Sequence, residues 1–149
     1  MENLRVLILA AGKSTRMKSK YAKVLHRAGG RTLIEHVLAT ARNLSSDICV
    51  VVGHSADQVK AAISEVTFVD QKEQLGTGHA VLAARQHFSG YSGDVLIMPG
   101  DVPLIQASTL EAFVRFHRDG RFRCCVLTAE LEEPRGYGRI VRRNNHEVN

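Results

Sequence analysis

Apolar residues along this chain gather in short continuous runs, and longer amphipathic stretches separate one run from the next. The runs are rich in β-branched residues, and most do not alternate with polar positions, which is typical of strands covered on both faces. We therefore predict strands at residues 4–9, 48–52, 66–69, 95–98 and 124–127. Because helical patterns separate them, the sequence favours an α/β fold with a mostly parallel sheet and helices on both faces.

Four stretches between these runs have apolar residues at helical spacing. In the stretch at residues 32–44 the apolar side chains share one helical face, and Thr32 and Glu35 have capping-box spacing at its start. The other predicted helices cover residues 56–63, 77–87 and 107–118. The 149 residues show no internal repeat, linker or low-complexity tract, so residues 1–149 are expected to form a single domain.

Basic residues are concentrated in one part of the chain. Twenty Lys and Arg against fifteen Asp and Glu give a formal net charge of +5 at pH 7. Seven of the basic residues fall within residues 13–31, which contain no acidic residue. This clustering predicts a local anion-binding site rather than a generally basic surface. Nucleic acid is not the expected partner, because this stretch has no aromatic residue besides Tyr21 and no known motif.

Composition excludes several classes of protein. The chain is 44% hydrophobic and 23% charged, ordinary values that exclude a disordered chain, a coiled coil and a collagen. No apolar run approaches the length that spans a membrane, so no membrane partner is expected. The three cysteines include the adjacent pair Cys124 and Cys125 and form no CxxC motif, which predicts reduced thiols in a cytoplasmic protein.

Glycines and polar residues follow each of the first four predicted strands. These segments are residues 12–23, Gly53 with His54, residues 71–77, and Gly100 with Asp101. Parallel strands bring their carboxyl ends to one edge of the sheet, and ligands of such sheets bind outside that edge. We therefore predict a single site assembled from these four segments.

The first segment has the composition of an anion-binding loop. Small residues after a buried strand let the backbone approach a ligand, and successive amides can point at anionic oxygens. It is not a Walker loop, because Leu7 stands where that motif requires a glycine. Arg16 and Lys23 are spaced to bracket a polyphosphate, Arg16 as a planar fork and Lys23 as a point charge. An ordinary glycine turn between strand and helix is the alternative.

Two further segments add a carboxylate and a pair of amides. Asp101 stands at the tip of a predicted strand, where it would hold a divalent cation against a phosphate. The alternative is that Asp101 only caps the turn that follows. Gln71 and Gln74 offer paired donors and acceptors that suit the edge of a pyrimidine, a signal that is weak by itself. The seven histidines have no metal-ligand spacing, so none is expected to bind a metal.

The chain resembles one family, the uridyltransferase domain of bacterial N-acetylglucosamine-1-phosphate uridyltransferases, through LAAGKSTRMKSKYAKVL, QKEQLGTGHA, GDVPLI and GYGRI. The resemblance covers essentially all 149 residues, and EQLGTGHA with GYGRI separates it from looser relatives. It implies a Rossmann-like nucleotidyltransferase fold with three layers. It also implies that UTP and N-acetylglucosamine 1-phosphate are joined into UDP-N-acetylglucosamine, a peptidoglycan precursor, with release of pyrophosphate and with Mg²⁺ as cofactor.

The resemblance also implies roles for individual residues. The nucleotide would contact Leu9, Ala10, Ala11, Gly12, Gln71, Gly76, Thr77, Pro99, Gly100 and Asp101. Arg16 would hold the leaving pyrophosphate, Lys23 the α-phosphate and Asp101 the Mg²⁺, while Gly138 would line the sugar pocket. Such a transfer needs no protein nucleophile, because the attacking phosphate is already an anion. It needs positioning and neutralisation of developing charge.

The sequence departs from the family at a few positions. Ser14 replaces a usual Gly, Ala22 a usual Pro, and Pro99 a common Tyr. The family's later sugar-binding residues, second metal ligand and acetyltransferase β-helix would lie beyond residue 149, so a truncated, catalytically impaired nucleotide-binding fragment is one alternative. A cytidylyl- or guanylyltransferase of the same fold is another. We also expect the predicted strand at 124–127 and a hairpin-like segment at 138–142 to lie at a sheet edge, where a second copy would form a homodimer.

Overall fold

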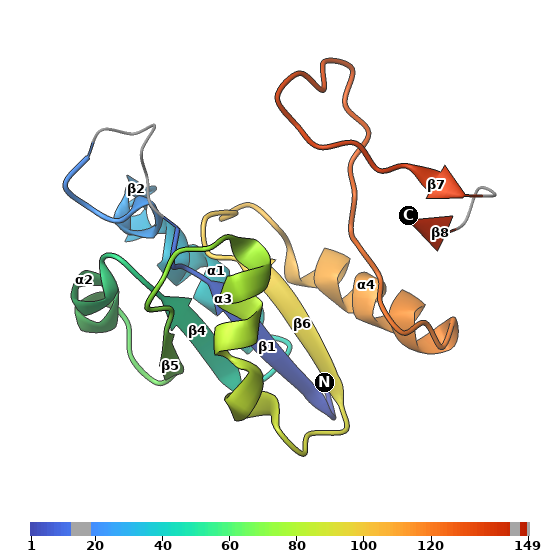
Figure 1. The fold of residues 1–149 in the computed structure, drawn as a ribbon, viewed down its shortest axis with the longest axis horizontal. Helices are drawn as coiled ribbons and strands as arrows, with labels where there is room; N and C mark the ends of the chain where they lie inside the picture. The colour runs from blue at the N-terminus through green and yellow to red at the C-terminus, as the bar shows by residue number, and fades with distance from the viewer. Residues whose placement is uncertain (13–18, 144–146, 149) are drawn as a thin grey trace.

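The computed structural model describes residues 1–12, 19–143 and 147–148, and its centre is a parallel sheet (Figure 1). Four strands form this sheet in the order β5-β4-β1-β6, and every neighbouring pair is parallel. The strands are β1 Leu4–Leu9, β4 Ile48–Val52, β5 Thr67–Asp70 and β6 Asp94–Pro99. The predicted α/β architecture is confirmed, and the bounds of β1 and β4 are those predicted.

Helices cover both faces of this sheet. They are α1 Leu33–Arg42, α2 Ala56–Ala62, α3 Thr77–Ala83 and α4 Ala107–Asp119, with 3₁₀ turns η2 Lys23–Leu25 and η3 Arg85–Phe88. Figure 1 shows α3 lying across one face of the sheet. Buried residues of α1, α2 and α4 pack with the other face, where Val6, Ile8 and Val50 are fully buried. Within the described residues, no helix is long and apolar enough to cross a membrane.

The start of α1 shows why this segment forms a helix at the predicted place. The Glu35 backbone N–H donates to Thr32 Oγ1 at 3.3 Å, and the Thr32 backbone N–H donates to Glu35 Oε2 at 2.6 Å. This is the predicted capping box, which satisfies two backbone donors that the first turn leaves without partners. The hydrogen bonds from the Thr32 backbone and hydroxyl also hold the pKa of Glu35 below its ordinary value.

The smaller core, under α3, contains a buried thiol. Cys49 of β4 is fully buried there with Leu7 and Val51 of the sheet and Ala80 and Ala84 beneath them. Burial, with a smaller contribution from the charge of Asp47, raises the pKa of Cys49 to about 11. The side chain therefore packs as a small hydrophobic group.

The predicted strand at 124–127 is wrong. Cys124–Leu127 has neither helix nor strand structure, and Val126 and Leu127 are 58% and 49% exposed. Cys124 and Cys125 line a cavity beside β6 without pairing with it, and the chain beyond them leads away from the sheet (Figure 1). The free edge on this side is β6 itself.

Smaller differences concern element ends and short pairings. The predicted helix at 77–87 divides into α3 and the 3₁₀ turn η3, and β5 begins one residue later than predicted. The segment at 138–142 does not join the main sheet. Instead β7 (Arg142–Arg143) pairs antiparallel with β8 (Glu147–Val148), and β2 (Arg27–Ala28) pairs antiparallel with β3 (Arg31–Thr32).

Candidate functional site

The order of the strands defines where a ligand can enter. The chain passes from β1 outward to β4 and β5, and then returns to β6 on the other side of β1. The direction of winding therefore reverses between β1 and β6, and open α/β sheets bind ligands at the carboxyl edge of such a point. All four strands are parallel, so the four segments predicted to form the site do follow carboxyl ends at this one edge.

Backbone hydrogen bonds continue the sheet past the strand ends and fix the segments to one another. The Ala10 N–H donates to the Val51 carbonyl at 2.8 Å, and the Gly100 N–H donates to the Leu9 carbonyl at 2.9 Å. The loop that begins after β1 is thus held on one side by β4 and on the other by β6. Leu9, Ala10 and Gly100, all predicted to contact a nucleotide, lie together.

Two glycines allow this close approach. A Cβ on Gly53 would lie 2.7 Å from the carbonyl oxygen of Ala11, and one on Gly100 would lie 3.1 Å from the carbonyl oxygen of Leu9 and 3.2 Å from Val24 Cγ1. Gly53 leaves no room for a side chain, because the facing oxygen belongs to the backbone, whereas at Gly100 a Cβ would make a tight contact that the neighbouring atoms would have to relieve by a small shift. Gly53 thereby sets the place of Ala11, a role that its sequence neighbours do not reveal.

Lys23 and Asp101 meet at the point where the winding reverses. The ammonium group of Lys23, the first residue of η2, forms an ion pair with Asp101 Oδ2. The Lys23 side chain is 44% exposed and that of Asp101 26%, so both charged groups are open to solvent and to a ligand. The residues predicted to hold a phosphate and a cation are therefore brought together, and in this structure each neutralises the other.

Gln58 of α2 supports the segment that leads to Lys23. Its Oε1 accepts a hydrogen bond from the Ala22 N–H at 3.4 Å, and its Nε2 donates to the Lys20 carbonyl at 3.5 Å. Sequence reasoning missed this residue. A polar side chain at an exposed position of a predicted helix carries no signal of a partner far away in the chain.

The third segment forms a closed loop around Gln71. This side chain is only 4% exposed; its Nε2 donates to the Gly76 carbonyl at 3.3 Å and lies 3.0 Å from His79 Nδ1. Gln74 donates from its Nε2 to the Gln71 carbonyl at 3.0 Å. Gly76 has a φ of +102°, a backbone region that favours glycine, and the exposed Thr77 begins α3 after it. Gly76 and Thr77 are therefore exposed on this loop, and the Gln71 side chain is buried and held in place by hydrogen bonds beneath them.

The remaining predicted residues are less closely tied to this edge. Gly12 and Pro99 are exposed at the ends of the β1 and β6 segments. Arg16 lies outside the described residues. Gly138 is exposed in the segment after α4, and no atom of the described chain beyond its sequence neighbours lies within 4 Å of where its Cβ would be.

The donor set at this edge fits a magnesium ion. The described residues contain no group of three His, Cys, Asp or Glu side chains that would enclose a metal. Mg²⁺ does not need such a group, because it keeps several waters and is commonly bound by one or two carboxylates together with phosphate oxygens. Asp101, accessible beside a lysine, can supply the carboxylate.

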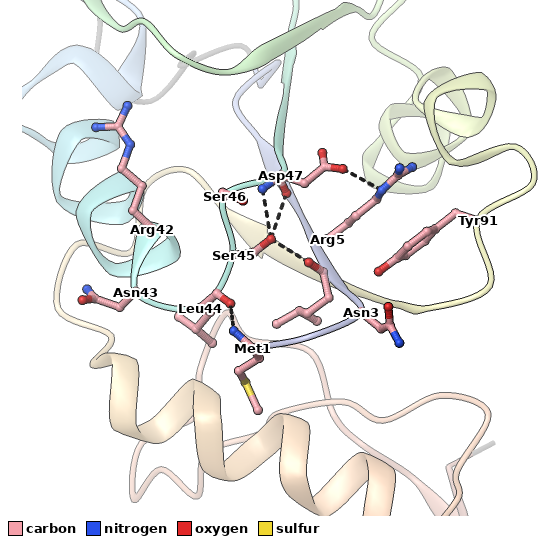
Figure 2. Close-up of a pocket in the computed structure, with 11 residues that line it drawn as sticks. Met1, Asn3, Arg5, Arg42, Asn43, Leu44, Ser45, Ser46, Asp47 and Tyr91 are labelled. Atoms are coloured by element: carbon pink, nitrogen blue, oxygen red, sulfur yellow. Dashed lines mark hydrogen bonds and ion pairs between the residues drawn. The ribbon is translucent and has the colours of Figure 1, made fainter.

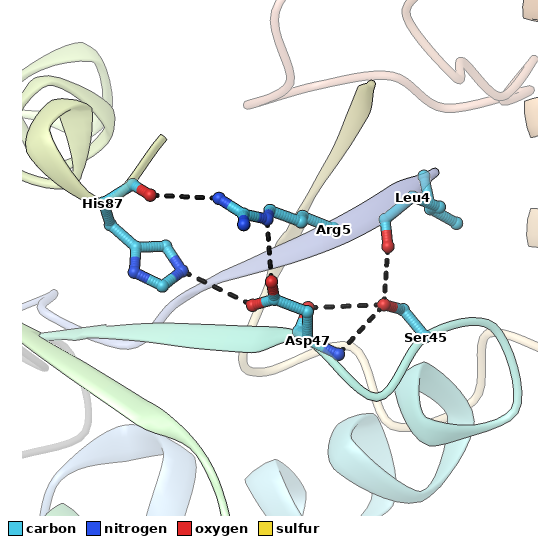
Figure 3. Close-up of polar contacts among 5 residues, drawn as sticks. All are labelled: Leu4, Arg5, Ser45, Asp47 and His87. Carbon is cyan, nitrogen blue, oxygen red and sulfur yellow. Dashed lines mark hydrogen bonds and ion pairs between the residues drawn. The ribbon is translucent and has the colours of Figure 1, made fainter. Parts of the chain in front are cut away.

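A second polar region lies at the amino ends of the strands, and its residues hold the neighbouring loops together. A cavity of about 450 Å³ lies there, and Figure 2 shows Arg5 extended beside Tyr91, with its guanidinium 4.1 Å from the ring centre. Arg5 Nε also pairs with Asp47 Oδ2 at 2.7 Å, and its Nη1 donates to the His87 carbonyl at 3.1 Å (Figure 3). Ser45 Oγ donates to the carbonyl of Leu4 at 2.6 Å. These groups satisfy one another and join the loops at the amino ends of the strands.

A parallel sheet whose reversal point carries a small-residue loop, a lysine and an accessible carboxylate has the arrangement typical of nucleotide-binding α/β proteins. Comparison with known sequences is more specific. The family described as "MobA-like NTP transferase domain" matches residues 6–144. The chain belongs to this family.

Curated relatives make the similarity more specific. The chain is 50% identical over 139 residues to the bifunctional protein GlmU of Synechococcus elongatus, a match that covers 91% of this chain and 31% of GlmU. It is 50% identical over 141 residues to the bifunctional protein GlmU of Alkaliphilus metalliredigens, covering 93% of this chain and 31% of that protein. The chain thus spans about a third of the length of these relatives.

A solved structure supports the fold independently. Rv0371c from Mycobacterium tuberculosis H37Rv, in its complex with manganese, superposes with a TM-score of 0.63 at 22% identity, covering 78% of this chain and 60% of Rv0371c. At this identity the likeness establishes the Rossmann-like nucleotidyltransferase fold alone. The manganese belongs to that protein.

Proposed function

We propose that this chain binds UTP with Mg²⁺ as the nucleotide-binding part of a sugar-1-phosphate nucleotidyltransferase. Its reaction would join UTP and N-acetylglucosamine 1-phosphate into UDP-N-acetylglucosamine and release pyrophosphate. The observation that carries the proposal is the meeting of Lys23 and Asp101 at the reversal point of the sheet, beside the loop that begins at Ala10. The 50% identity to proteins named GlmU supports the choice of UTP and of this sugar phosphate.

The chemistry asks little of the protein beyond position and charge. An oxygen of the sugar phosphate attacks the α-phosphorus of UTP, a new P–O bond forms, and the bond to the oxygen that bridges to the β-phosphate breaks, so that pyrophosphate leaves. No proton needs to be removed from the attacking phosphate. Lys23 would neutralise the α-phosphate, which lowers the barrier because negative charge gathers there in the transition state. Arg16 remains the proposed partner of the leaving pyrophosphate.

Asp101 would hold the Mg²⁺. When bound there, the ion supplies neutralisation of the phosphate oxygens and helps to orient them. The carboxylate suits this role because it follows Gly100, whose N–H is fixed to the Leu9 carbonyl at the end of β1. Asp101 is therefore held next to the loop on which the phosphates would lie.

The other predicted contacts divide between phosphates, base and sugar. The backbone of Leu9, Ala10, Ala11 and Gly12 would cradle the nucleotide, with Pro99 and Gly100 closing its other side. Uracil would lie on the loop formed by Gln71, Gly76 and Thr77. The Gln71 side chain is buried and its Nε2 is engaged by the Gly76 carbonyl and His79, so it would act by fixing the loop that carries Gly76 and Thr77. Gly138 stays a prediction for the sugar pocket.

Calorimetric titration with each nucleoside triphosphate in the presence of Mg²⁺ tests this function. We expect UTP to bind at least tenfold more tightly than CTP, GTP or ATP, since a base whose polar groups do not match the loop leaves hydrogen-bonding groups without partners at about 1–3 kcal/mol each. Asp101→Asn should remove the dependence of UTP binding on Mg²⁺ without unfolding the chain. Preference for CTP or GTP would instead indicate a cytidylyl- or guanylyltransferase, and equal UTP binding with and without Mg²⁺ would contradict the role of Asp101.

A further inference from the structure

The ion pair between Lys23 and Asp101 joins two segments whose backbones are fixed independently. On one side, Val24 next to Lys23 is buried in the core, and the Ala22 N–H is bonded to Gln58. On the other, the backbone just before Asp101 is bonded to the end of β1. The fold therefore holds the two backbones at a separation at which the side chains pair directly.

This contact places the two proposed ligand-binding groups in competition with the ligands themselves. The lysine ammonium and a divalent cation both require the carboxylate oxygens of Asp101. In the same way, the carboxylate of Asp101 and an α-phosphate both require the ammonium of Lys23. Neither ligand can take its full set of contacts while the ion pair remains.

We propose that Lys23 acts as a tethered competitor that keeps divalent cations off Asp101 until a nucleotide phosphate draws the lysine away. This rests on the proposed function of the site, and it adds a coupling between the two ligands. A cation alone binds weakly, and a nucleotide that engages Lys23 frees Asp101 for the cation. By linkage the effect is reciprocal, so the cation also favours nucleotide binding.

The size of the effect follows from exposure. Both side chains are partly open to solvent, so the ion pair is screened and of modest strength. Removing the lysine should therefore strengthen the binding of a cation alone by about fivefold. An equal change of charge that makes no contact with Asp101 should change it by less than about twofold, because exposed charges further apart are screened.

The experiment uses Mn²⁺ alone as the probe, titrated in the absence of nucleotide and followed by electron paramagnetic resonance of the free ion. Lys23→Met and, as a second variant, Lys23→Gln should bind Mn²⁺ about fivefold more tightly than the unmodified chain. Lys20→Met is the matched control, since Lys20 is an exposed lysine of the same basic segment. The double variant Lys23→Met with Asp101→Asn should lose the gain, which assigns it to that carboxylate. Circular dichroism of each variant checks that it is folded.

Unchanged Mn²⁺ affinity in both Lys23 variants overturns the proposal, and so does an equal gain in Lys20→Met. The Mn²⁺ titration can fail independently of the UTP titration that tests the proposed function. If UTP binds with Mg²⁺ but Mn²⁺ affinity does not respond to Lys23, only the competition is wrong. If the Lys23 variants gain Mn²⁺ affinity but UTP does not bind, the ion pair competes as described and the proposed nucleotide is wrong.

Discussion

Replacing Gly53 by alanine should disturb the loop after β1 while leaving the rest of the fold in place. A Cβ at this position would lie 2.7 Å from the Ala11 carbonyl oxygen and 3.0 Å from Ala11 Cβ. Non-bonded heavy atoms are most favourable at roughly 3.5–4.0 Å, so the added methyl group overlaps its neighbours. The atoms that face it are backbone or lie directly on the backbone, and therefore the loop has to move.

The magnitude can be worked from this overlap. Inserting a methyl group into a closely packed position destabilises a protein by about 1–3 kcal/mol. For a chain of this size each kcal/mol lowers Tm by roughly 2–4 °C, so Gly53→Ala should unfold several degrees below the unmodified chain. If moving Ala11 removes one charge-assisted hydrogen bond to a phosphate, UTP affinity falls by roughly tenfold to a hundredfold.

Thermal unfolding and UTP calorimetry on the same samples provide the assay. Gly78→Ala is the stability control, because outside its chain neighbours and the backbone of its own helix no atom lies within 4 Å of its Cβ position. Because alanine is the better helix former, this control should be at least as stable as the unmodified chain, and it shows that adding a methyl group to a glycine does not by itself lower Tm. Ordinary stability and UTP affinity in Gly53→Ala would refute the reasoning. Loss of stability alone would show that the Ala11 loop does not carry the nucleotide.

Three further results are expected. Thr32→Ala should lower Tm by roughly 2–4 °C in thermal unfolding. The Thr32 backbone, and to a smaller extent its hydroxyl, lower the pKa of Glu35, so the stability they contribute is present above the ordinary value of 4.5 and is lost as the pH falls through the lowered value. Because alanine removes only the hydroxyl, the variant should lose slightly less stability than the unmodified chain over that acid range. Cys49, buried and with its pKa raised to about 11, should resist a thiol reagent that modifies the exposed Cys124, as mass spectrometry of the labelled protein would show. The free edge of β6 should pair with a second copy, so light scattering should give a dimer that Ile97→Lys, at a half-exposed edge position, returns to the 16.4 kDa monomer; a monomer mass for the unmodified chain at high concentration would contradict this.

The parts of the fold that could be predicted are those whose pattern and environment agree. β4 is buried at every position and its sequence is an unbroken apolar run, so both of its ends were predictable. The capping box of Thr32 and Glu35 is local, and four neighbouring residues suffice to form it. Cys124–Leu127 has an equally apolar pattern but no partner strand in the described structure. The hydrophobic pattern of a segment shows which side chains it can bury, whereas strand pairing also depends on whether the rest of the fold places a partner strand beside it.

Part of the candidate site could likewise be predicted from the sequence, and part depends on the strand order. That Gly100 and Asp101 would lie at the same sheet edge as the Ala10 loop could be predicted, because every parallel strand ends on that edge. The contact between Asp101 and Lys23 could not be predicted, since it depends on β6 being the neighbour of β1, and hydrophobic periodicity does not reveal the order of strands. Gly53 was visible only as a glycine after a strand, because its function lies in the space that Ala11 occupies.

Strand order explains why we propose the loop after β1, rather than any other loop, as the place where a phosphate binds. Among the four strands of the described sheet, only β1 lies where the winding direction reverses. Its neighbours are β4 on one side and β6 on the other. Its following loop therefore receives Gly53 from β4, which gives the backbone room, and Asp101 from β6, which gives a carboxylate. The loops after β4 and β5 lie on one side of β1, so they do not stand between strands of opposite winding direction. A strand inserted between β1 and β6 would keep every motif of the sequence and yet separate Lys23 from Asp101, so the site depends on adjacency as much as on residue type.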